Sequence, residues 1–302
     1  MDSKVNQRNT GTEKRRTSRI EVSSDGVLMD LLLEKFSQRN RNFFKTLLKF
    51  KKIKVDGRVV LQYNYPLKKG QLVEINWEKE SEKSLPGGIE ILYEDHDIIV
   101  INKPAGMLAV ATMSEKTRTA YSILSDHVKK QHRNNKIYVI HRLDRETSGI
   151  MMYAKNHDIK ESIKEDWYNN VPERTYVAVV EGRIKPPAGT IVSWLKENSG
   201  TFMYSSHDRE GKKAVTHYET LQSSGDFSLL KIELETGRKN QIRVHMQDKG
   251  VPVTGDRKYG AKMNPISRLA LHAMVLAFLH PRTGKLMRFE SRIPDSFLRL
   301  VK

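Results

Sequence analysis

The first apolar residues of the chain recur at helical spacing and then begin to alternate with polar ones. One helical face is formed by Val27, Leu28, Leu31, Leu32 and Phe36, and a second by Phe44, Leu47 and Leu48. Ile53 and Val55 then alternate with lysines before Asp56-Gly57, a dipeptide that favours a tight hairpin turn because it tolerates positive φ. The pattern predicts a small helix–helix–hairpin unit.

From residue 89 onward, short apolar runs of strand length dominate the pattern. They are Ile89-Glu-Ile-Leu-Tyr, Ile98-Ile-Val-Ile, Ile137-Tyr-Val-Ile, Gly149-Ile-Met-Met-Tyr-Ala, Thr175-Tyr-Val-Ala-Val-Val and Ser228-Leu-Leu-Lys-Ile-Glu-Leu. Helical patterns are fewer, near residues 120–130 and 158–169. Many strands with occasional helices predict an α+β domain with a mixed, largely antiparallel sheet.

The composition between these regions indicates the domain boundaries. Residues 1–19 are polar and basic, and we expect a flexible tail because they cannot bury enough apolar surface to fold. Residues 20–78 would form the small domain and residues 89–302 the larger one. Residues 79–88 are highly charged and end in Pro-Gly-Gly, which is typical of a linker.

The formal net charge of +17 favours a polyanionic partner, either a nucleic acid or an anionic membrane surface. The longest apolar stretch, Leu269–Leu279, contains His272 and is shorter than the roughly 20 residues of a spanning helix, so we expect no membrane contact. The opening residues carry no apolar core of a secretory leader, and we therefore expect a cytoplasmic protein.

Positive charge is concentrated in the small domain. Between Arg39 and Arg58 the chain has eight basic residues and one acidic residue, which is an electrostatic footprint for phosphates. The residues that we expect to contact RNA are Arg39, Arg41, Lys45, Lys49, Lys52 and Lys54. An ordinary charged face on a structural domain is the alternative.

The chain contains no cysteine, which excludes disulfides, thiolate nucleophiles and cysteine-bound zinc. The densest cluster of other reactive groups is His141-Arg-Leu-Asp-Arg-Glu-Thr-Ser-Gly149, between two strand-like runs and therefore in a loop at a sheet edge. It lacks the serine frame of a nucleophile elbow and the order of a kinase catalytic loop. The chain also lacks a phosphate-binding loop and His-Glu-x-x-His, so nucleotide hydrolysis and zinc hydrolysis are not supported.

Asp144, taken alone, could be a structural carboxylate that caps backbone amides or pairs with an arginine. Its context indicates more, because His141–Gly149 is similar to the catalytic motif of the RluA-like RNA pseudouridine synthases. Further blocks that resemble this family follow its order, at residues 94–106, 173–182, 236–245, 255–260 and 268–273. The resemblance extends over about residues 88–295.

The resemblance implies a mixed sheet with a basic cleft, in which Asp144 isomerises uridine in structured RNA without a cofactor or a metal. A carboxylate can do this covalently or by proton transfer at the sugar. It must stay ionised in a partly dry pocket and therefore needs a fixed cation, for which Arg243 matches the family's partner arginine. Tyr176 matches the active-site tyrosine that stacks on the target base. Without the resemblance, Arg243 could brace the sheet edge and Tyr176 could belong to the core.

Three further residues are expected at the substrate. Arg142 matches an arginine that fills the gap left by the extruded uridine, and a phosphate contact is the alternative. Leu271 would form an apolar wall of the pocket or pack in the core, and Gln241 matches the glutamine of the same family motif as Arg243. The chain departs from the family at Lys239-Asn240, where Thr-His is common, so local RNA contacts or loop geometry are expected to differ.

Residues 20–78 resemble the S-four-type RNA-binding domain. The matches are Asn40-Arg41, Leu48 and the segments 52–60 and 67–75, whereas Lys51 replaces a common glycine and Asn40 a common serine. A separate domain of this type resembles the large-subunit ribosomal RNA enzymes more than the minimal transfer RNA enzymes. The expected partner is therefore RNA, with 23S-type ribosomal RNA favoured and transfer RNA as the alternative.

Two other classes of protein remain open on the sequence. One is a non-catalytic RNA-binding or ribosome-assembly protein that retains the fold. The other is a glycosidase or nucleoside hydrolase that uses Asp144 and Glu146 as paired carboxylates. The intact set of Asp144, Tyr176 and Arg243 argues against the first class. The second class would release free uracil and leave an abasic product, whereas isomerisation leaves the RNA mass unchanged.

Overall fold

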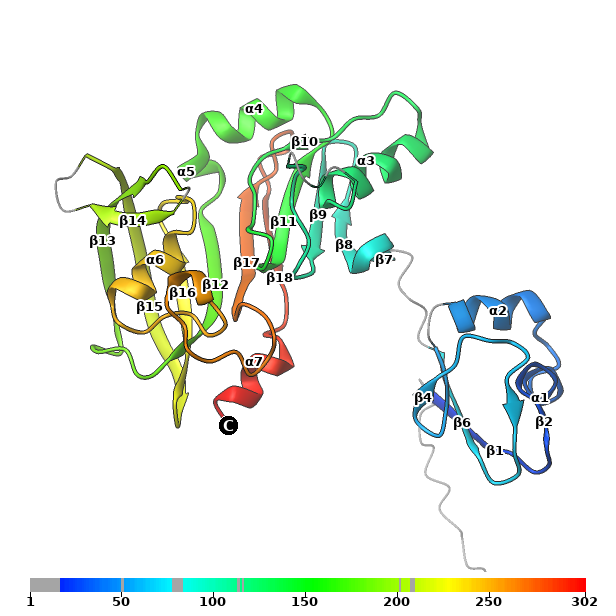
Figure 1. The fold of residues 1–302 in the computed structure, drawn as a ribbon. Coiled ribbons are helices and arrows are strands. Elements are labelled where there is room, and N and C mark those ends of the chain that lie inside the picture. The colour runs from blue at the N-terminus through cyan, green and yellow to red at the C-terminus, as the bar shows by residue number, and fades with distance from the viewer. Residues whose placement is uncertain are drawn as a thin grey trace, which may run out of the picture. The chain divides into compact units, whose positions relative to one another are not determined.

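The computed structural model describes residues 17–49, 52–77, 84–112, 115, 117–200, 202–206 and 210–302. The chain divides into two compact units, residues 1–82 and 83–302 (Figure 1). Residues 1–16 of the predicted tail and 79–83 of the predicted linker lie outside the described residues. The remaining parts of both differ from the prediction, because Thr17–Glu21 and Ser84–Leu85 are strands that pair with neighbouring strands.

The first unit is a small sheet packed against two helices. Its elements are β1 Thr17–Glu21, β2 Gly26–Val27, α1 Leu28–Lys35, α2 Arg41–Lys49, β3 Ile53–Val55, β4 Arg58–Val59, β5 Pro66–Leu67 and β6 Leu72–Asn76. The sheet order is β1-β6-β3-β4, and β2 pairs with β5. Leu32 and Phe44 of the helices pack on Ile53 and Ile75 of the sheet. Asp56-Gly57 joins β3 to β4, and both residues have positive φ.

The second unit contains a sheet of 12 strands among the described residues. The strands are β7 Ser84–Leu85, β8 Ile89–Glu94, β9 Ile98–Lys103, β10 Tyr138–Val139, β11 Ser148–Ala154, β12 Glu173–Glu181, β13 Ala188–Glu197, β14 Met203–Ser206, β15 Lys212–Ser224, β16 Phe227–Leu234, β17 Leu271–Leu279 and β18 Leu286–Glu290. The order is β14-β13-β15-β16-β12-β17-β11-β9-β8-β7, with β10 on β11 and β18 on β17. Only β11 and β17 pair in parallel among these strands, so the predicted α+β class with a mixed, largely antiparallel sheet is confirmed.

Helices cover parts of this sheet. They are α3 Ala120–Gln131, α4 His157–Glu165, α5 Trp167–Asn170, α6 Gln241–Asp248 and α7 Asp295–Leu300, with short 3-10 turns η1 Pro86–Gly88 and η2 Arg257–Tyr259. The single helix expected at residues 158–169 is divided, because the Asp166 side chain accepts a hydrogen bond from Asn169 N–H and caps α5. Among the described residues, none of the helices is long and apolar enough to span a membrane.

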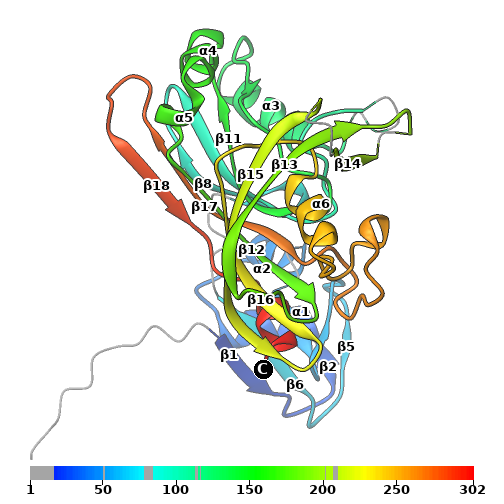
Figure 2. The ribbon, with the colours of Figure 1, turned by 90° about the vertical axis from the view of Figure 1, so that its left-hand side faces the viewer.

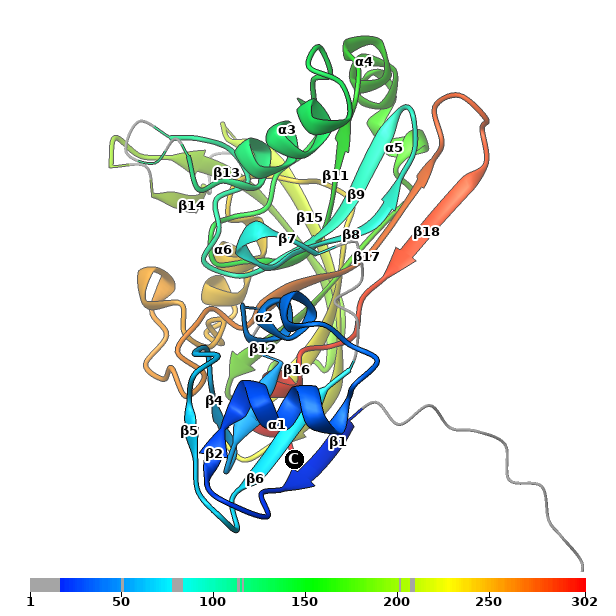
Figure 3. The ribbon, with the colours of Figure 1, turned by 90° about the vertical axis from the view of Figure 1, so that its right-hand side faces the viewer.

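Strands β9 and β11 are buried on both faces. Ile99 and Tyr153 belong to the core that includes residues of α3, whereas Ile98 and Met152 pack on the opposite face with Ile163 of α4 (Figure 3). Successive side chains of a strand point to opposite faces, so both sets of side chains are covered. On the other half of the sheet, the long strands β13, β15 and β16 run side by side (Figure 2). The central strands therefore form a rigid support for the loops at their ends.

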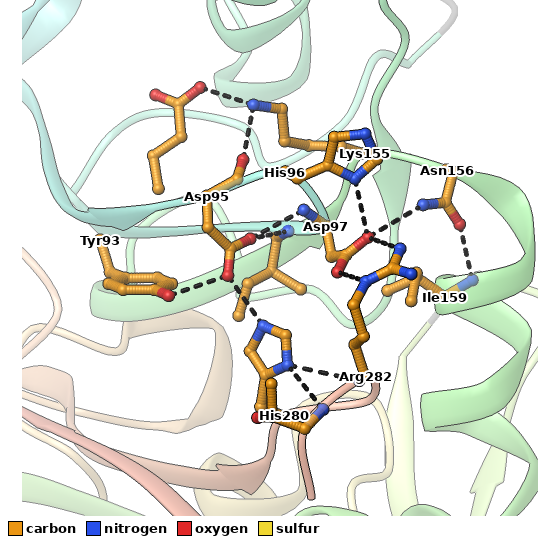
Figure 4. Close-up of polar contacts among 12 residues, drawn as sticks. Tyr93, Asp95, His96, Asp97, Lys155, Asn156, Ile159, His280 and Arg282 are labelled. Carbon is orange, nitrogen blue, oxygen red and sulfur yellow. Dashed lines mark hydrogen bonds and ion pairs between the residues drawn. The ribbon is translucent and has the colours of Figure 1, made fainter. Parts of the chain in front are cut away.

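The β8–β9 turn is tied to the β17–β18 turn by polar contacts, in which Asp97 and His280 are buried (Figure 4). Arg282 donates two hydrogen bonds of 2.6 Å to Asp97, and the Asp97 side chain is only 3 % exposed. Asp95 accepts hydrogen bonds from the Tyr93 hydroxyl and from His280 Nε2, both at 2.8 Å. These contacts explain the charged residues that follow β8 in the sequence.

Candidate active site

The loop between β10 and β11 holds Asp144. Leu143 is buried in the core beneath this loop, whereas Arg142 is exposed and the Asp144 side chain is 32 % exposed. The Thr147 N–H donates to the Asp144 carbonyl at 3.2 Å, which closes a turn directly after the carboxylate. Burial of Leu143 therefore anchors the loop while its two polar neighbours stay accessible.

The loop ends at Gly149, where only glycine fits. Gly149 has a φ of +119°, and a Cβ atom here would lie 2.2 Å from the carbonyl oxygen of Ala273. At this point β11 begins its parallel pairing with β17, and Gly149 lies opposite Ala273. The glycine allows this close approach, so it determines where the catalytic loop leaves the sheet.

A buried lysine supports the loop from β9. Lys103 Nζ donates to the carbonyl oxygens of Pro104, Met107 and Arg145 at 2.9, 2.8 and 3.2 Å. Burial lowers the pKa of Lys103 to about 8, against a raising effect of Glu146, so the ammonium is still mostly charged at pH 7. The three hydrogen bonds join the segment after β9 to the catalytic loop.

A chain of hydrogen bonds holds the other end of the loop. Ser148 Oγ accepts from Arg268 Nη2 at 2.8 Å and lies 2.7 Å from His272 Nδ1. His272 Nε2 lies 2.7 Å from Ser291 Oγ. Burial, with a smaller effect from the charge of Arg268, lowers the pKa of His272 to about 4, so the ring is neutral at pH 7. Neutral His272 accepts from Ser148 and donates to Ser291, which fixes the start of β11.

Arg243 of α6 reaches the catalytic loop from the other half of the sheet. Its Nη1 lies 3.3 Å from Asp144 Oδ2, and its Nε and Nη2 donate to Asp256 at 2.6 and 2.7 Å. The guanidinium also lies over the Tyr259 ring, 4.8 Å from its centroid. Burial lowers the pKa of Arg243, but hydrogen bonds to Asp256 and the charges of both carboxylates raise it overall. Asp256 therefore fixes the orientation of the guanidinium, and Asp144 contacts the remaining nitrogen, Nη1.

The start of α6 explains the Lys239-Asn240 departure. Asn240 adopts the left-handed conformation with φ 55°, which asparagine tolerates better than most residues. Its Nδ2 donates to the Tyr259 hydroxyl at 2.9 Å, beneath the ring that carries Arg243. Lys239 pairs with Glu197 of β13. Of the two residues that depart from the family, Asn240 thus supports Arg243 through Tyr259, and Lys239 contacts the neighbouring hairpin.

Gln241 is buried, and its amide is fully engaged by the protein. Oε1 accepts from Thr236 Oγ1 and Arg238 N–H at 2.7 and 3.0 Å, and Nε2 donates to Val215 O and Thr216 Oγ1 at 3.0 and 2.9 Å. An amide has two donors and one two-fold acceptor, so its capacity is filled. The Gln241 amide therefore has no free donor or acceptor for the predicted substrate contact. Its hydrogen bonds position the start of α6 instead.

Tyr176 of β12 lies half-buried beside a β-bulge. The register between β12 and β17 shifts between Thr175 and Tyr176, and bulges of this kind redirect a side chain near a site. Burial, opposed by the charge of Arg174 and aided by that of Asp144, raises the pKa of Tyr176 to about 12. The hydroxyl is therefore protonated at neutral pH and can donate a hydrogen bond.

One pocket brings the predicted residues of the second unit together. It encloses about 390 Å³ of space, partly open to solvent. Its lining is Arg142, Leu143, Asp144, Thr147, Tyr176, Leu234, Arg238, Asn240, Gln241, Ile242, Arg243 and Leu271. All six residues predicted for catalysis and substrate binding are in this set. Asp256 and Lys103 were not predicted. Both belong to the family-like blocks of the sequence, but neither lines the pocket itself.

The basic residues predicted to bind RNA belong to the first unit. Arg39, Arg41, Lys45 and Lys54 are exposed, and Lys52 is half-buried. Arg39 lies over the Phe43 ring at 4.7 Å, and Lys45 lies over the Tyr63 ring at 5.0 Å. The side chain of Lys49 lies outside the described residues. The structure thus places aromatic rings beside two of these cations.

One pocket beside the mixed sheet thus holds the loop residue Asp144 together with Arg243 and Tyr176. A family model described as RNA pseudouridylate synthase matches residues 97–248, which is half of the chain. The chain belongs to this family and is an enzyme of the isomerase class. The matched residues include Asp144, Tyr176 and Arg243.

Relatives and solved structures agree with this assignment. The chain is 37 % identical to the uncharacterized RNA pseudouridine synthase YlyB of Bacillus subtilis, over 82 % of this chain and 86 % of the relative. It is 31 % identical to the ribosomal large subunit pseudouridine synthase D of Haemophilus influenzae, over 89 % and 88 %. The fold is similar to human RNA pseudouridylate synthase domain containing 4, with a TM-score of 0.57 and 24 % identity over 70 % of this chain and 90 % of that one. These findings support the RluA-like resemblance.

Proposed function

We propose that the enzyme converts specific uridines of large-subunit ribosomal RNA to pseudouridine, with Asp144 as the catalytic carboxylate. The observation that carries this proposal is the contact of Asp144 with Arg243, which Asp256 clamps by two shorter hydrogen bonds. A fixed cation keeps a neighbouring carboxylate ionised when a substrate excludes water. An ionised carboxylate can attack the sugar or take a proton from it, and neither route needs a cofactor.

The reaction rearranges one nucleotide without net hydrolysis or oxidation. The bond between the sugar and N1 of uracil breaks, the base turns while it is held, and C5 bonds to the sugar. The proton lost from C5 is matched by one gained at N1. Asp144 acts at the sugar during bond cleavage, and Arg243 stabilises its negative charge throughout.

Other residues of the pocket hold the base. The Tyr176 ring offers a stacking surface worth about 1–3 kcal/mol for an unstacked base. Its hydroxyl is protonated, because burial raises the pKa of Tyr176 to about 12, and can donate to the reacting nucleotide. Leu271 is buried and supplies an apolar wall. Arg142 is exposed, so its guanidinium can fill the gap that the extruded base leaves in the RNA.

Two observations favour ribosomal RNA as the substrate. Several relatives, including those of Haemophilus influenzae and Vibrio cholerae, are named ribosomal large subunit pseudouridine synthase D. The two helices, the hairpin and the exposed cations of the first unit support an S-four-like RNA-binding domain at residues 20–78. We infer that this unit contacts phosphates and that the enzyme acts on RNA in the cytoplasm. Transfer RNA is the competing substrate.

Mass spectrometry of treated RNA tests the proposal. Purified enzyme is incubated with a 23S-type ribosomal RNA fragment and, separately, with transfer RNA, and products are labelled with a reagent specific for pseudouridine. We expect the mass of the ribosomal RNA to be unchanged before labelling, and the label then to be found in this RNA. Free uracil with an abasic product would instead indicate a glycosidase, no change would indicate a binding protein, and label in transfer RNA alone would reassign the substrate.

A further inference from the structure

A second concave surface adjoins the catalytic pocket and has no role in the proposal above. It lies between the start of α3, β10 with the residues that follow it, and α4. These three elements are labelled at one end of the second unit in Figure 1. It encloses about 880 Å³, largely open to solvent. We call it the side groove and define it by Tyr121, Tyr138, His141, Arg142, Lys160 and Lys164. Because Arg142 also lines the catalytic pocket, the two surfaces are continuous.

The charges of the side groove suit a polyanion. Its lining includes Arg142, Lys160 and Lys164 and no carboxylate among the described residues. Lys160 and Lys164 are four residues apart on α4 and therefore lie on one helix face. Lys164 is exposed, whereas Lys160 pairs with Glu161 at 2.7 Å. Burial lowers the pKa of His141 to about 4, so this ring adds no charge at pH 7.

Two tyrosines lie among these cations. Tyr121, the second residue of α3, is 38 % exposed and so offers part of its ring to a ligand. Tyr138 of β10 is half-buried and meets the His157 ring edge-on at 5.8 Å. Aromatic faces beside basic side chains bind single-stranded nucleic acid, because bases stack on the rings while phosphates contact the cations.

The other hollows that adjoin the catalytic pocket differ in charge. The one that shares Leu234 with it is lined by Glu173, Glu233 and Glu235 beside Arg174 and His217, and its three carboxylates repel phosphates. The one that shares Arg238 with it contains lysines paired with glutamates, as in Lys196–Glu210. Of these three surfaces, the side groove alone combines cations and aromatic rings with an absence of lining carboxylates.

We propose that the side groove binds the unpaired RNA segment next to the extruded uridine, with bases on Tyr121 and Tyr138 and phosphates on Lys160 and Lys164. The inference rests on the proposed function of the catalytic pocket. Arg142 marks the point at which the strand passes from the pocket into the groove. The groove contacts nucleotides that do not react, so its contribution is to binding and register rather than to the chemical step.

A double-mutant cycle between protein and RNA tests the stacking contact. Tyr121→Ala is combined with RNA fragments that carry one abasic nucleotide, scanned over the positions on each side of the target. At one flanking position the abasic change should weaken wild-type binding roughly tenfold, which corresponds to the loss of one stacked base. The same change should have little further effect on Tyr121→Ala, because the partner ring is already gone. Independent effects at every position would overturn the proposal.

Lys160→Gln/Lys164→Gln tests the phosphate contacts. The slope of log affinity against log salt should flatten by about 1.4, since each single-strand phosphate contact contributes about 0.7. Lys129→Gln/Lys130→Gln removes the same charge from the exposed last turn of α3, outside the groove, and should keep the wild-type slope. Equal slopes for both double variants would also overturn the proposal.

The rate at saturating RNA separates the groove from the proposed function. Thermal unfolding first confirms that each variant is folded. In single turnovers, the groove variants should need more RNA but keep a saturated rate within about threefold of wild type, as expected for binding that is equal in ground and transition states. If the wild type forms pseudouridine but the groove variants bind RNA as well as the wild type does, the groove proposal is wrong and the proposed function stands. If Tyr121 and one flanking nucleotide are coupled in binding but the wild type forms no pseudouridine, the proposed function is wrong and the groove remains an RNA-binding surface.

Discussion

Arg243 touches Asp144 with one nitrogen at 3.3 Å while two other nitrogens hold Asp256 at 2.6 and 2.7 Å. The Asp256 side chain is 1 % exposed and that of Asp144 is 32 % exposed. The buried carboxylate of Asp256 therefore orients the guanidinium, and the accessible carboxylate of Asp144 is stabilised by the positive charge of the guanidinium. This division allows Asp144 to change partners during a reaction without releasing the arginine.

Replacement of Asp144 by asparagine should abolish catalysis but not folding or RNA binding. The amide keeps the size of the side chain and loses its charge and nucleophilicity. We expect pseudouridine formation to fall by about 10⁴-fold or more in single turnovers. Glu146→Gln is the matched control, because Glu146 is exposed in the same loop and is the second carboxylate of the glycosidase alternative. Substantial turnover by Asp144→Asn, or equal loss in Glu146→Gln, would contradict the assignment.

Loss of the cation should be almost as damaging as loss of the carboxylate. Arg243→Leu removes the charge beside Asp144 and leaves buried Asp256 without its two hydrogen bonds, so we expect a rate lower by about 10²–10³-fold. Asp256→Asn keeps the cation but loosens it, and should cost about 10- to 100-fold in saturated rate with RNA affinity preserved. Single-turnover rates and binding curves measure both. A normal rate for Arg243→Leu would show that another cation serves Asp144.

Gly149→Ala should disrupt the catalytic loop. A Cβ atom at this position would lie 2.2 Å from the Ala273 carbonyl oxygen, where β11 and β17 begin to pair. We expect the free energy of unfolding to fall by more than about 2 kcal/mol, with activity lost in any folded fraction. Gly284→Ala is the control, because Gly284 also has positive φ but no atom lies within 4 Å of a Cβ there. Urea denaturation of both variants checks the difference, and equal costs would show that backbone strain alone is responsible.

Acid should weaken the contact between the β8–β9 and β17–β18 turns. Hydrogen bonds from Arg282, chiefly, lower the pKa of Asp97 below its ordinary value. Since the unfolded chain binds this proton at a pKa of about 3.9, the contact contributes its full stability above that pH and loses it as pH falls toward the folded pKa. The free energy of unfolding should therefore decline less steeply below pH ~4 in Asp97→Asn than in wild type. Parallel pH profiles from urea denaturation would refute this.

The two partners of this contact should differ in their cost at neutral pH. Arg282→Met leaves a carboxylate that is 3 % exposed without its main donor, and should cost about 2–3 kcal/mol. Asp97→Asn leaves an arginine that is 60 % exposed and free to be solvated by water, and should cost less. The same denaturation series at pH 7 ranks the two variants.

Deletion of residues 1–82 should separate binding from chemistry. The second unit contains its own cores and the complete pocket, so it should fold and keep its single-turnover rate at saturating RNA. Affinity should fall, and the salt slope should flatten by about 0.7–0.9 for each phosphate contact that the first unit makes. An unchanged salt slope would mean that the cations around α2 and β3 are only a solvated face.

Local patterns in the sequence identified many of the elements and most residues of the candidate site, but not β13, β14, β15, β17, β18, α6 or α7. Helical spacing in residues 27–48 and the strand-length runs after residue 89 correspond to observed helices and strands, because side-chain periodicity is a property of neighbouring residues. The loop motif located Asp144, and the family-like blocks located Arg243 and Tyr176. The α4–α5 break was missed, since it depends on one capping side chain.

Only the tertiary structure decided how these residues are supported. Lys103 beneath the loop, Asp256 behind Arg243 and the filled amide of Gln241 each depend on contacts between segments that are distant in the sequence. Such contacts arise from strand order and register, for example from the parallel pairing of β11 with β17. Periodicity identifies a strand without naming its neighbour. For this reason the sequence predicted the candidate reacting groups, whereas packing alone determined which of them meet and which, like Gln241, already have all their hydrogen bonds made within the protein.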